Sequence, residues 1–287
     1  MQMWGRWGPA DERGALNLLG PAQVMRGLAE VRDGRTISLA APIVSGRGYS
    51  IVGRTPPTHY MIRDGGDYAA GLPERGGFGF ADDVITLPTH GVTHVDALAH
   101  VWCDGQLYNG HDSRHVTSRG AARLGVDKMS PIVTRGVFID AAPGQHRSPG
   151  DHIHTDELQQ RLAAVDVELM PGDALLVRTG WMEAFAQGQA DATRWAGLDR
   201  DCAQWLADRE VVLVGADNGG VESLPSSDPN CQVPLHIDLL RGCGVYFCEL
   251  MNLAALAAAA RPTFLFVLCP LPLVGGVGSP VAPIAVL

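Results

Sequence analysis

Short apolar runs rich in β-branched side chains recur along the chain, which is the pattern of buried β-strands. Residues 211–214 read Val-Val-Leu-Val and predict a strand covered on both faces, because both parities are apolar. Eight strands are predicted in this way, at residues 36–43, 84–89, 136–140, 174–179, 211–216, 245–250, 263–268 and 283–286.

Helical spacing and helix-end residues predict fewer helices. Pro21 stands where a first helical residue is favoured, and Gly34 follows the end of the same segment. Thr155 is a suitable N-cap, and the two acidic residues after it suit the positive end of the helix dipole. The predicted helices are residues 21–31, 155–165, 199–208, 234–240 and 250–259. Because strands outnumber helices and most helices fall between strands, we expect one α/β domain with a strand-rich, mixed or barrel-like core.

Composition narrows the class of protein. The net charge is −9, from 22 Lys and Arg against 31 Asp and Glu, and no basic tract suggests a nucleic-acid partner. The most apolar stretch, near residues 250–260, is too short to span a bilayer, and the opening residues do not resemble a signal peptide. The six cysteines form no C-x-x-C pair and are typical of reduced core residues, so we expect a cytoplasmic protein.

Four side chains suited to metal chemistry fall within eleven residues: His90, His94, Asp96 and His100. All share even parity, which places them on one face of an extended chain, and a helix would still bring His90 and His94 together. Two imidazoles and a carboxylate suit zinc or manganese with open coordination positions. Such an ion lowers the pKa of bound water from about 16 toward about 7, and His100 is the expected proton shuttle.

Residues 90–100 read His-Gly-Val-Thr-His-Val-Asp-Ala-Leu-Ala-His and resemble the H-x-G-T-H-x-D-x-x-x-H signature of the cyclase family. That family includes bacterial kynurenine formamidases and isatin hydrolases. Val92 stands where the family has glycine, and Leu98 stands where proline is common. The resemblance runs from about residue 10 to the C-terminus. The extended opening and the insertion around residues 108–111 are similar to the longer, less characterised members.

The resemblance implies a swivelling β/β/α domain over residues 1–287, assembled as a homodimer or homotetramer. It implies that His90, His94 and Asp96 bind a first divalent metal, zinc or manganese. Asp96 would bridge to a second ion held by His236 and Glu249, giving one or two ions per subunit. Residues 1–20 are a candidate N-terminal arm that lies on a neighbouring subunit.

Weaker candidates for substrate binding are Trp102, Asp217 and Ser279. Asp217 ends an apolar strand, which suits a functional side chain, although it could equally cap the following turn. Trp102 could line a pocket or pack in the core, and Ser279 lies in a segment that resembles the family. Arg178 could pair with Asp173 or orient an anionic substrate.

The activity expected from these residues is hydrolysis of an amide-type C–N bond in a small-molecule substrate, either an N-formyl amide or a cyclic amide. Metal-activated water would attack the carbonyl, and His100 would act as general acid and base. No G-x-S-x-G motif supports a serine mechanism. The alternatives are a metal-dependent cyclase or dehydratase acting on a carbonyl substrate, and a metal-bearing binding protein without turnover.

Overall fold

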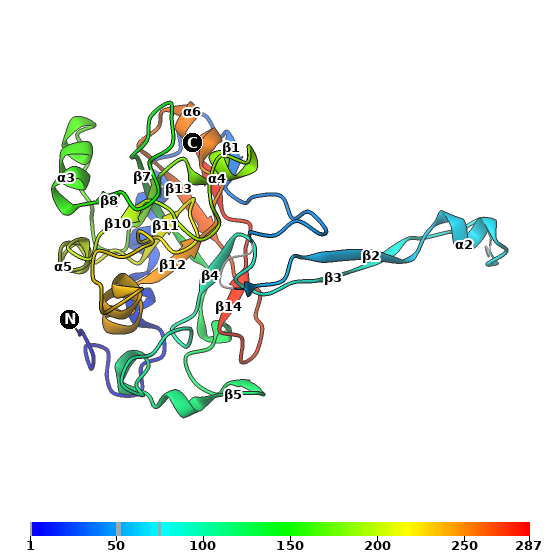
Figure 1. The fold of residues 1–287 in the computed structure, drawn as a ribbon, viewed down its shortest axis with the longest axis horizontal. Helices are drawn as coiled ribbons and strands as arrows, with labels where there is room; N and C mark the ends of the chain where they lie inside the picture. The colour runs from blue at the N-terminus through cyan, green and yellow to red at the C-terminus, as the bar shows by residue number, and fades with distance from the viewer. Residues whose placement is uncertain (1, 50–52, 74–75) are drawn as a thin grey trace.

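One curled, mixed sheet dominates the computed structural model, which describes residues 2–49, 53–73 and 76–287 (Figure 1). Within these residues the sheet has nine strands, in the spatial order β1 (Thr36–Ser38), β15 (Ile284–Val286), β13 (Thr263–Leu268), β7 (Ile132–Asp140), β9 (Ala174–Arg178), β11 (Leu213–Ala216), β12 (Tyr246–Glu249), β4 (His94–Asp96) and β14 (Gly278–Pro280). Strands β7, β9, β11 and β12 are mutually parallel, whereas the strands on both sides pair antiparallel. The predicted α/β class with a strand-rich mixed core is confirmed.

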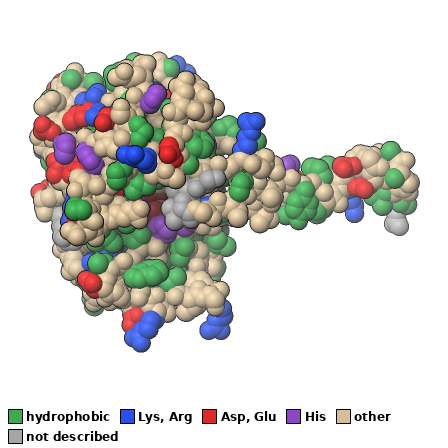
Figure 2. All heavy atoms as spheres, viewed as in Figure 1, with side chains coloured by type: hydrophobic (Ala, Val, Ile, Leu, Met, Phe, Trp, Pro, Cys, Tyr) green, Lys and Arg blue, Asp and Glu red, His purple; other side chains and the backbone are tan. Residues whose placement is uncertain are grey.

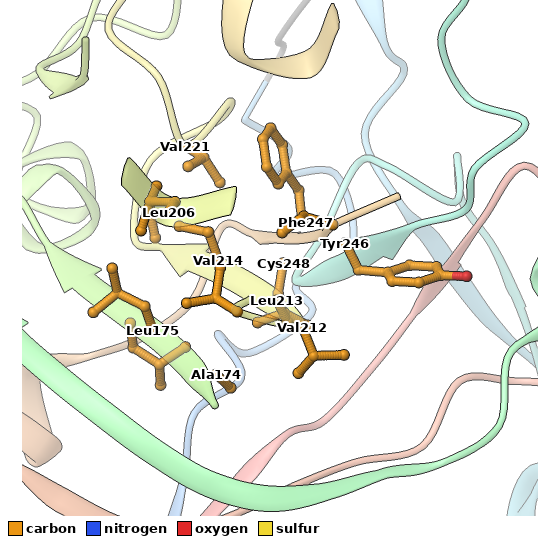
Figure 3. Close-up of a cluster of buried hydrophobic side chains, with 14 of the residues drawn as sticks. Ala174, Leu175, Leu206, Val212, Leu213, Val214, Val221, Tyr246, Phe247 and Cys248 are labelled. Carbon is orange, nitrogen blue, oxygen red and sulfur yellow. The ribbon is translucent and has the colours of Figure 1, made fainter. Parts of the chain in front are cut away.

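The parallel strands are covered on both faces, as their uniformly apolar sequence predicts. Val212, Leu213 and Val214 are fully buried, and Figure 3 shows them among Leu175 of β9 and Phe247 of β12. Each such side chain contributes about 1.5–3 kcal/mol when it leaves water. This packing makes the centre of the sheet a rigid base for the loops at its edges.

The helices surround the sheet with bounds that only partly match the predictions. They are α1 (Pro21–Leu28), α3 (Thr155–Ala164), α4 (Trp181–Ala186), α5 (Cys202–Asp208), the π-helix η6 (His236–Arg241) and α6 (Ala254–Ala259). The predicted helix 250–259 begins only at Ala254, because Leu250 adopts a φ of 54° and Met251 forms a β-bridge. Helix α4 was not predicted, and it follows Gly180, whose φ is 79°.

Smaller elements decorate this frame. Strand β8 (His152–Ile153) pairs parallel with β10 (Gly197–Leu198), and β5 (Val116–Thr117) pairs antiparallel with β6 (Gly120–Ala121). Short 3-10 turns occupy η1 (Gly14–Leu18), η3 (Tyr108–Gly110), η4 (Ser113–His115) and η5 (Val126–Lys128). Among the described residues, none of the helices has both the length and the apolar character that crossing a bilayer demands.

A long hairpin projects from the body and is called the arm here (Figure 1). It consists of β2 (Thr58–Arg63) paired with β3 (Asp82–Thr86), with α2 (Gly65–Ala69) near its tip. We predicted residues 84–89 as a strand of the core, but the structure places residues 84–86 in this arm and leaves residues 87–89 outside any strand. The arm leaves large apolar side chains exposed, among them Tyr60, Ile62, Phe78, Phe80 and Ile85.

The N-terminal segment makes contacts with its own chain, and the arm on a neighbouring subunit that we expect for residues 1–20 stays a prediction. The Met3 amide donates to the carbonyl of Gly242, and the Trp4 indole donates to the carbonyl of Arg241. The Arg241 guanidinium lies over the Trp4 ring, 4.6 Å from its centroid. Trp4 therefore anchors the start of the chain to the body of the same chain. Residue 1, part of the predicted segment, lies outside the described residues.

Candidate metal centre

Strand β4 carries the centre of the site and lies between β12 and β14. His94 and Asp96 occupy alternate positions and therefore share one face. In the register of the sheet, His94 pairs with Glu249 and Asp96 pairs with Gly278. Figure 2 shows a hollow in the body beside the base of the arm, with histidine and acidic side chains inside it.

We predicted that all four residues share one face of an extended segment, but only His94 and Asp96 lie on the same strand. His90 lies in the turn before β4, and His100 lies in a turn beyond it, where its amide donates to the carbonyl of Ala97. Both turns nevertheless fold back on the strand. The His90 and His100 rings stack with centroids 4.1 Å apart and an interplanar angle of 20°, so all four side chains converge.

A first group of possible ligand atoms comes from His90, His94 and Asp96, which lie close enough together to hold one ion. The Nε2 atom of His90 and the Nε2 atom of His94 each lie 3.3 Å from Oδ1 of Asp96. All three side chains are buried. This is the set that the sequence pattern indicated for a first metal.

A second group is formed by Asp96, His236 and Glu249. Nε2 of His236 lies 3.2 Å from Oε1 of Glu249 and 3.6 Å from Oδ2 of Asp96. Asp96 thus directs one oxygen to each group, and Oε2 of Glu249 also lies 3.3 Å from Nε2 of His94. The structure brings together the residues of the predicted two-ion arrangement.

The chemistry of these atoms fits a divalent cation. The Nε2 atoms of His90 and His94, both carboxylate oxygens of Asp96 and Oε1 of Glu249 are buried without a hydrogen-bond partner. Such orphaned atoms cost about 1–3 kcal/mol each unless something satisfies them. Ligands about 2.0–2.1 Å from a tetrahedral ion lie about 3.3 Å from one another, which matches the spacings between these side chains.

The Nδ1 atom of each candidate histidine ligand already forms a hydrogen bond within the chain. Nδ1 of His94 bonds the carbonyl of Val92 at 2.8 Å, and Nδ1 of His90 bonds the Thr89 hydroxyl at 3.0 Å. Nδ1 of His236 bonds a carboxylate oxygen of Glu222. Because these bonds fix the ring orientations, each Nε2 faces the site, as in metal-binding histidines.

Charge in the site is divided between ionised carboxylates and imidazoles. Burial raises the pKa of Glu249, but His236 and His94 reverse that effect and bring it to about 2. Burial likewise opposes ionisation of Asp96, yet the surrounding imidazoles hold its pKa well below the usual range. Burial lowers the pKa of His90 to about 3. Burial disfavours the charged forms of His94 and His236, but the same carboxylates raise the pKa of His94 to about 9 and that of His236 well above its usual value. These imidazolium groups balance the carboxylates, a role that a bound divalent ion would take over.

Glu222 is a functional residue that we did not predict. Its carboxylate accepts hydrogen bonds from the Leu235 amide at 2.8 Å and the His236 amide at 3.0 Å, besides the bond to the His236 ring. It lies in the loop that follows β11. A carboxylate that follows a buried parallel strand indicates a functional residue, but in the sequence Asp217 fits this description better than Glu222.

A cavity of about 490 Å³ adjoins the second group. His100, His236 and Glu249 line it, so the ligand groups open to the cavity. Arg54 adds a cation, and one of its nitrogens donates to the carbonyl of His90 at 2.9 Å. The remaining lining includes the apolar side chains Val101, Trp195, Leu224 and Val233. The arrangement suits a small molecule with an apolar body.

The three weaker substrate candidates do not line this cavity. Trp102 is half exposed. Asp217 is fully buried and accepts hydrogen bonds from the amides of Thr179 and Gly180, so it fixes a turn. Ser279 accepts from the Leu271 amide and donates to the Pro280 carbonyl. These hydrogen bonds hold both polar side chains in place, and the substrate-binding role expected for the three residues stays a prediction.

Arg178 also differs from both of its predicted roles. It pairs with Asp140 and Glu183, at 2.9 and 2.8 Å. The carboxylate of Asp173 is taken by Arg26 and Arg135 instead.

Comparisons with known proteins agree with the fold and the sequence pattern. The sequence profile of a putative cyclase family matches residues 35–223. The crystal structure of a novel cyclase aligns with a TM-score of 0.92 and 35% identity over 100% of both chains. Isatin hydrolase A from Ralstonia solanacearum aligns with a TM-score of 0.66 and 20% identity, over 88% of this chain and 92% of its own. A predicted metal-dependent hydrolase from Bacillus stearothermophilus gives 0.57 and 21%, over 88% and 98%. No curated protein matches the sequence.

Proposed function

The chain belongs to the putative cyclase family, and from that premise we propose that it is a metal-dependent hydrolase of an amide-type C–N bond. The observation that carries the proposal is the pair of ligand groups sharing Asp96, with orphaned buried atoms, at the wall of a cavity. Imidazole and carboxylate ligands suit zinc and manganese alike, with one or two ions per chain. When bound, the metal supplies Lewis acidity and lowers the pKa of a bound water.

His100 is the residue that we propose to move the proton. It lines the cavity, and its stacking on His90 fixes the plane of its ring. It belongs to neither ligand group, so a ring nitrogen is free to take a proton from the attacking water and deliver it to the leaving nitrogen. The apolar walls hold the substrate body and limit access of bulk water.

The names of structurally similar proteins support hydrolysis. They include isatin hydrolases, one of them bound to the product analogue thioisatinate, and a predicted metal-dependent hydrolase. We infer a substrate of comparable size, either an N-formyl amide or a cyclic amide, because the cavity volume and its apolar walls suit such molecules.

The decisive test replaces Asp96, the side chain common to both groups. Asp96→Ala is expected to lose bound metal and all hydrolysis of N-formyl and lactam substrates, whereas the exposed Asp33→Ala is expected to retain both. Because a buried substitution can affect folding, the wild-type protein is also stripped with a chelator and then given zinc or manganese. Full activity of Asp96→Ala, or of the stripped protein, would contradict the proposal.

A metal-dependent cyclase or dehydratase is the second candidate. The family description favours it, as does a similar structure described as a potential metal-dependent hydrolase with cyclase activity. The same site would then stabilise an enolate, with His100 as the base. Product analysis in oxygen-18 water separates the two reactions, because hydrolysis places the label in the product acid and cyclisation with loss of water does not.

A binding protein without turnover would require ligands closed off from any substrate, or a displaced His100. The structure disfavours this alternative, because His100, His236 and Glu249 all line the cavity. Tight metal binding without turnover across the substrate panel would favour it.

We also propose that the chain works as a homo-oligomer. A two-stranded hairpin is marginally stable alone, and the arm exposes apolar side chains along its length. A second copy of the chain is the partner that we expect to cover them.

A further inference from the structure

A second cluster of metal-ligating side chains lies away from the centre described above. His154, Asp199 and Asp201 place a ring nitrogen and two carboxylate oxygens within 4.8 Å of one another. Figure 2 shows histidine and acidic side chains side by side on this part of the body, away from the hollow at the base of the arm.

The backbone builds this cluster from two parallel strands. Gly197 of β10 pairs with His152 of β8, and Leu198 pairs with Ile153. His154 and Asp199 are the residues directly after these strands, and the Asp199 amide donates to the carbonyl of Ile153 at 2.9 Å. Asp201 precedes α5 and accepts a hydrogen bond from the amide of Thr155. The sheet pairing therefore fixes the side chains relative to one another.

Asp199, the buried member of the cluster, has one carboxylate oxygen without a hydrogen-bond partner. The Asp199 side chain is 9% exposed, and its Oδ2 atom has no hydrogen bond. His152 lies 3.3 Å away, but its Nδ1 atom is bonded to the Ser223 hydroxyl at 2.6 Å. That nitrogen therefore gives Oδ2 of Asp199 no hydrogen bond, although the two side chains form an ion pair when His152 is protonated.

The spacing between His154 and Asp201 differs from that of a hydrogen-bonded histidine–aspartate pair elsewhere in the chain. Nε2 of His59 and Oδ2 of Asp83, an exposed pair in the arm, form a hydrogen bond at 2.7 Å. Nδ1 of His154 lies 3.4 Å from Oδ2 of Asp201, close to the separation of about 3.3 Å between two ligands of one tetrahedral ion. The central site shows the same two signs, namely this spacing and orphaned buried oxygens.

We propose that His154, Asp199 and Asp201 form a separate binding site for a divalent transition metal of the zinc or manganese class. One imidazole and two carboxylates suit these ions. His154 and Asp201 are about half exposed, and none of the three ligands lines the cavity of the central site, so the ion would have a structural role. It neutralises Asp199 and ties β8 to β10. Leu198 of β10 bridges to Glu222, which orients His236, so the site stabilises one wall of the cavity.

The test counts ions in the full chain and does not use catalytic activity. A variant lacking central ligands, His94→Ala with Asp96→Ala, is dialysed against zinc and, separately, manganese, and its metal content is measured. It is expected to retain about one equivalent, which either Asp199→Asn or His154→Ala removes. In the otherwise wild-type chain, each of these two substitutions is expected to lower the content by about one equivalent.

The exposed pair of the arm provides the matched control, and His59→Ala is expected to leave the metal content unchanged. His154 is half exposed, so its replacement tests the site even if Asp199→Asn fails to fold. Equal metal content in wild type, His154→Ala and Asp199→Asn would overturn the proposal. Because activity plays no part, this failure is distinct from failure of the proposed hydrolase function.

Discussion

Glu222 is distant in sequence from the candidate metal ligands, yet its side chain orients one of them, His236. Its two oxygens accept three hydrogen bonds, from the Leu235 amide, the His236 amide and the His236 ring. Glutamine offers one acceptor oxygen, so its amide group would face a donor. Partners of this kind typically change metal affinity by about 10–100-fold.

We therefore expect Glu222→Gln to weaken metal binding by about 10–100-fold while the fold is retained. Competition with a chromophoric chelator measures the affinity, and the exposed Glu168→Gln serves as the control. An affinity equal to that of the wild type would show that Glu222 does not orient His236.

Asp217 gives a pH-dependent prediction. Burial raises its pKa to about 6, and the hydrogen bonds from Thr179 and Gly180 only partly oppose this. The unfolded chain has a value of about 3.9, so the folded chain binds the proton more tightly. The contribution of Asp217 to stability is complete below the unfolded pKa and is lost as pH rises through about 6.

Between about pH 5 and pH 7, wild type should therefore lose about 1.4 kcal/mol of stability relative to Asp217→Asn, which does not titrate. Urea unfolding of both proteins at each pH measures the difference. A difference that is constant across this range, or that changes in the opposite direction, would contradict the assignment.

Among individual residues, the sequence revealed those candidate ligands that lie close together along the chain. His90, His94, Asp96 and His100 stand within eleven positions, so their spacing alone indicated a common site. Glu222 escaped notice because its partner His236 is 14 residues away and its role depends on a turn. Asp217 had the expected position after a strand, but hydrogen bonds that no pattern reveals use its carboxylate in a turn.

Strand β14 acts on the site as an element, because it brings a residue without a side chain against a ligand. A Cβ atom at Gly278 would approach Nε2 of His90 more closely than van der Waals contact permits. The backbone at Gly278 is outside the left-handed region, so an alanine there would not strain the backbone. The clash would displace His90.

Gly278→Ala is thus expected to weaken metal binding at least about tenfold, a loss of the size seen when ligand orientation is disturbed. Gly65→Ala is the control, because a Cβ atom at Gly65 meets nothing within 4 Å. Calorimetric titration with zinc compares the variants. Unchanged affinity in Gly278→Ala would mean that His90 can move aside without cost.

Strands were predictable from the sequence where burial on both faces requires an uninterrupted apolar run. The parallel strands are apolar on both faces, and β9, β11 and β12 lie within the predicted segments. Strand β14 has the sequence Gly-Ser-Pro and lacks any apolar signature, so only its pairing with β4 makes it a strand. Strand β3 has the strand pattern but lies in the arm, since alternation does not reveal which sheet a strand joins.

Across the whole molecule, the candidate metal centre lies where the parallel half of the sheet meets its antiparallel edge. Glu249 ends the last parallel strand, β12, and Asp96 lies on the neighbouring antiparallel strand, β4. His236 reaches the same place from η6. The union of these segments follows from sheet order, which a single sequence does not encode in any local pattern. Family resemblance was what indicated His236 and Glu249.

In a single chain, the apolar side chains of the arm remain exposed to solvent. Two strands joined only to each other cannot bury Tyr60, Ile62 and Phe80, so the protein should gain stability when a second copy covers them. Thr58 and Thr86 are register partners at the base of the arm, so a short Gly-Ser turn can replace residues 59–85 without disturbing the body.

Light scattering after gel filtration is expected to show wild type as a dimer or tetramer and the armless variant as a folded monomer. Val274→Ser, which removes an exposed apolar side chain from the body, is expected to keep the mass of the wild type. A monomeric wild type, or an armless variant with unchanged assembly, would assign the exposed apolar side chains to something other than a second copy.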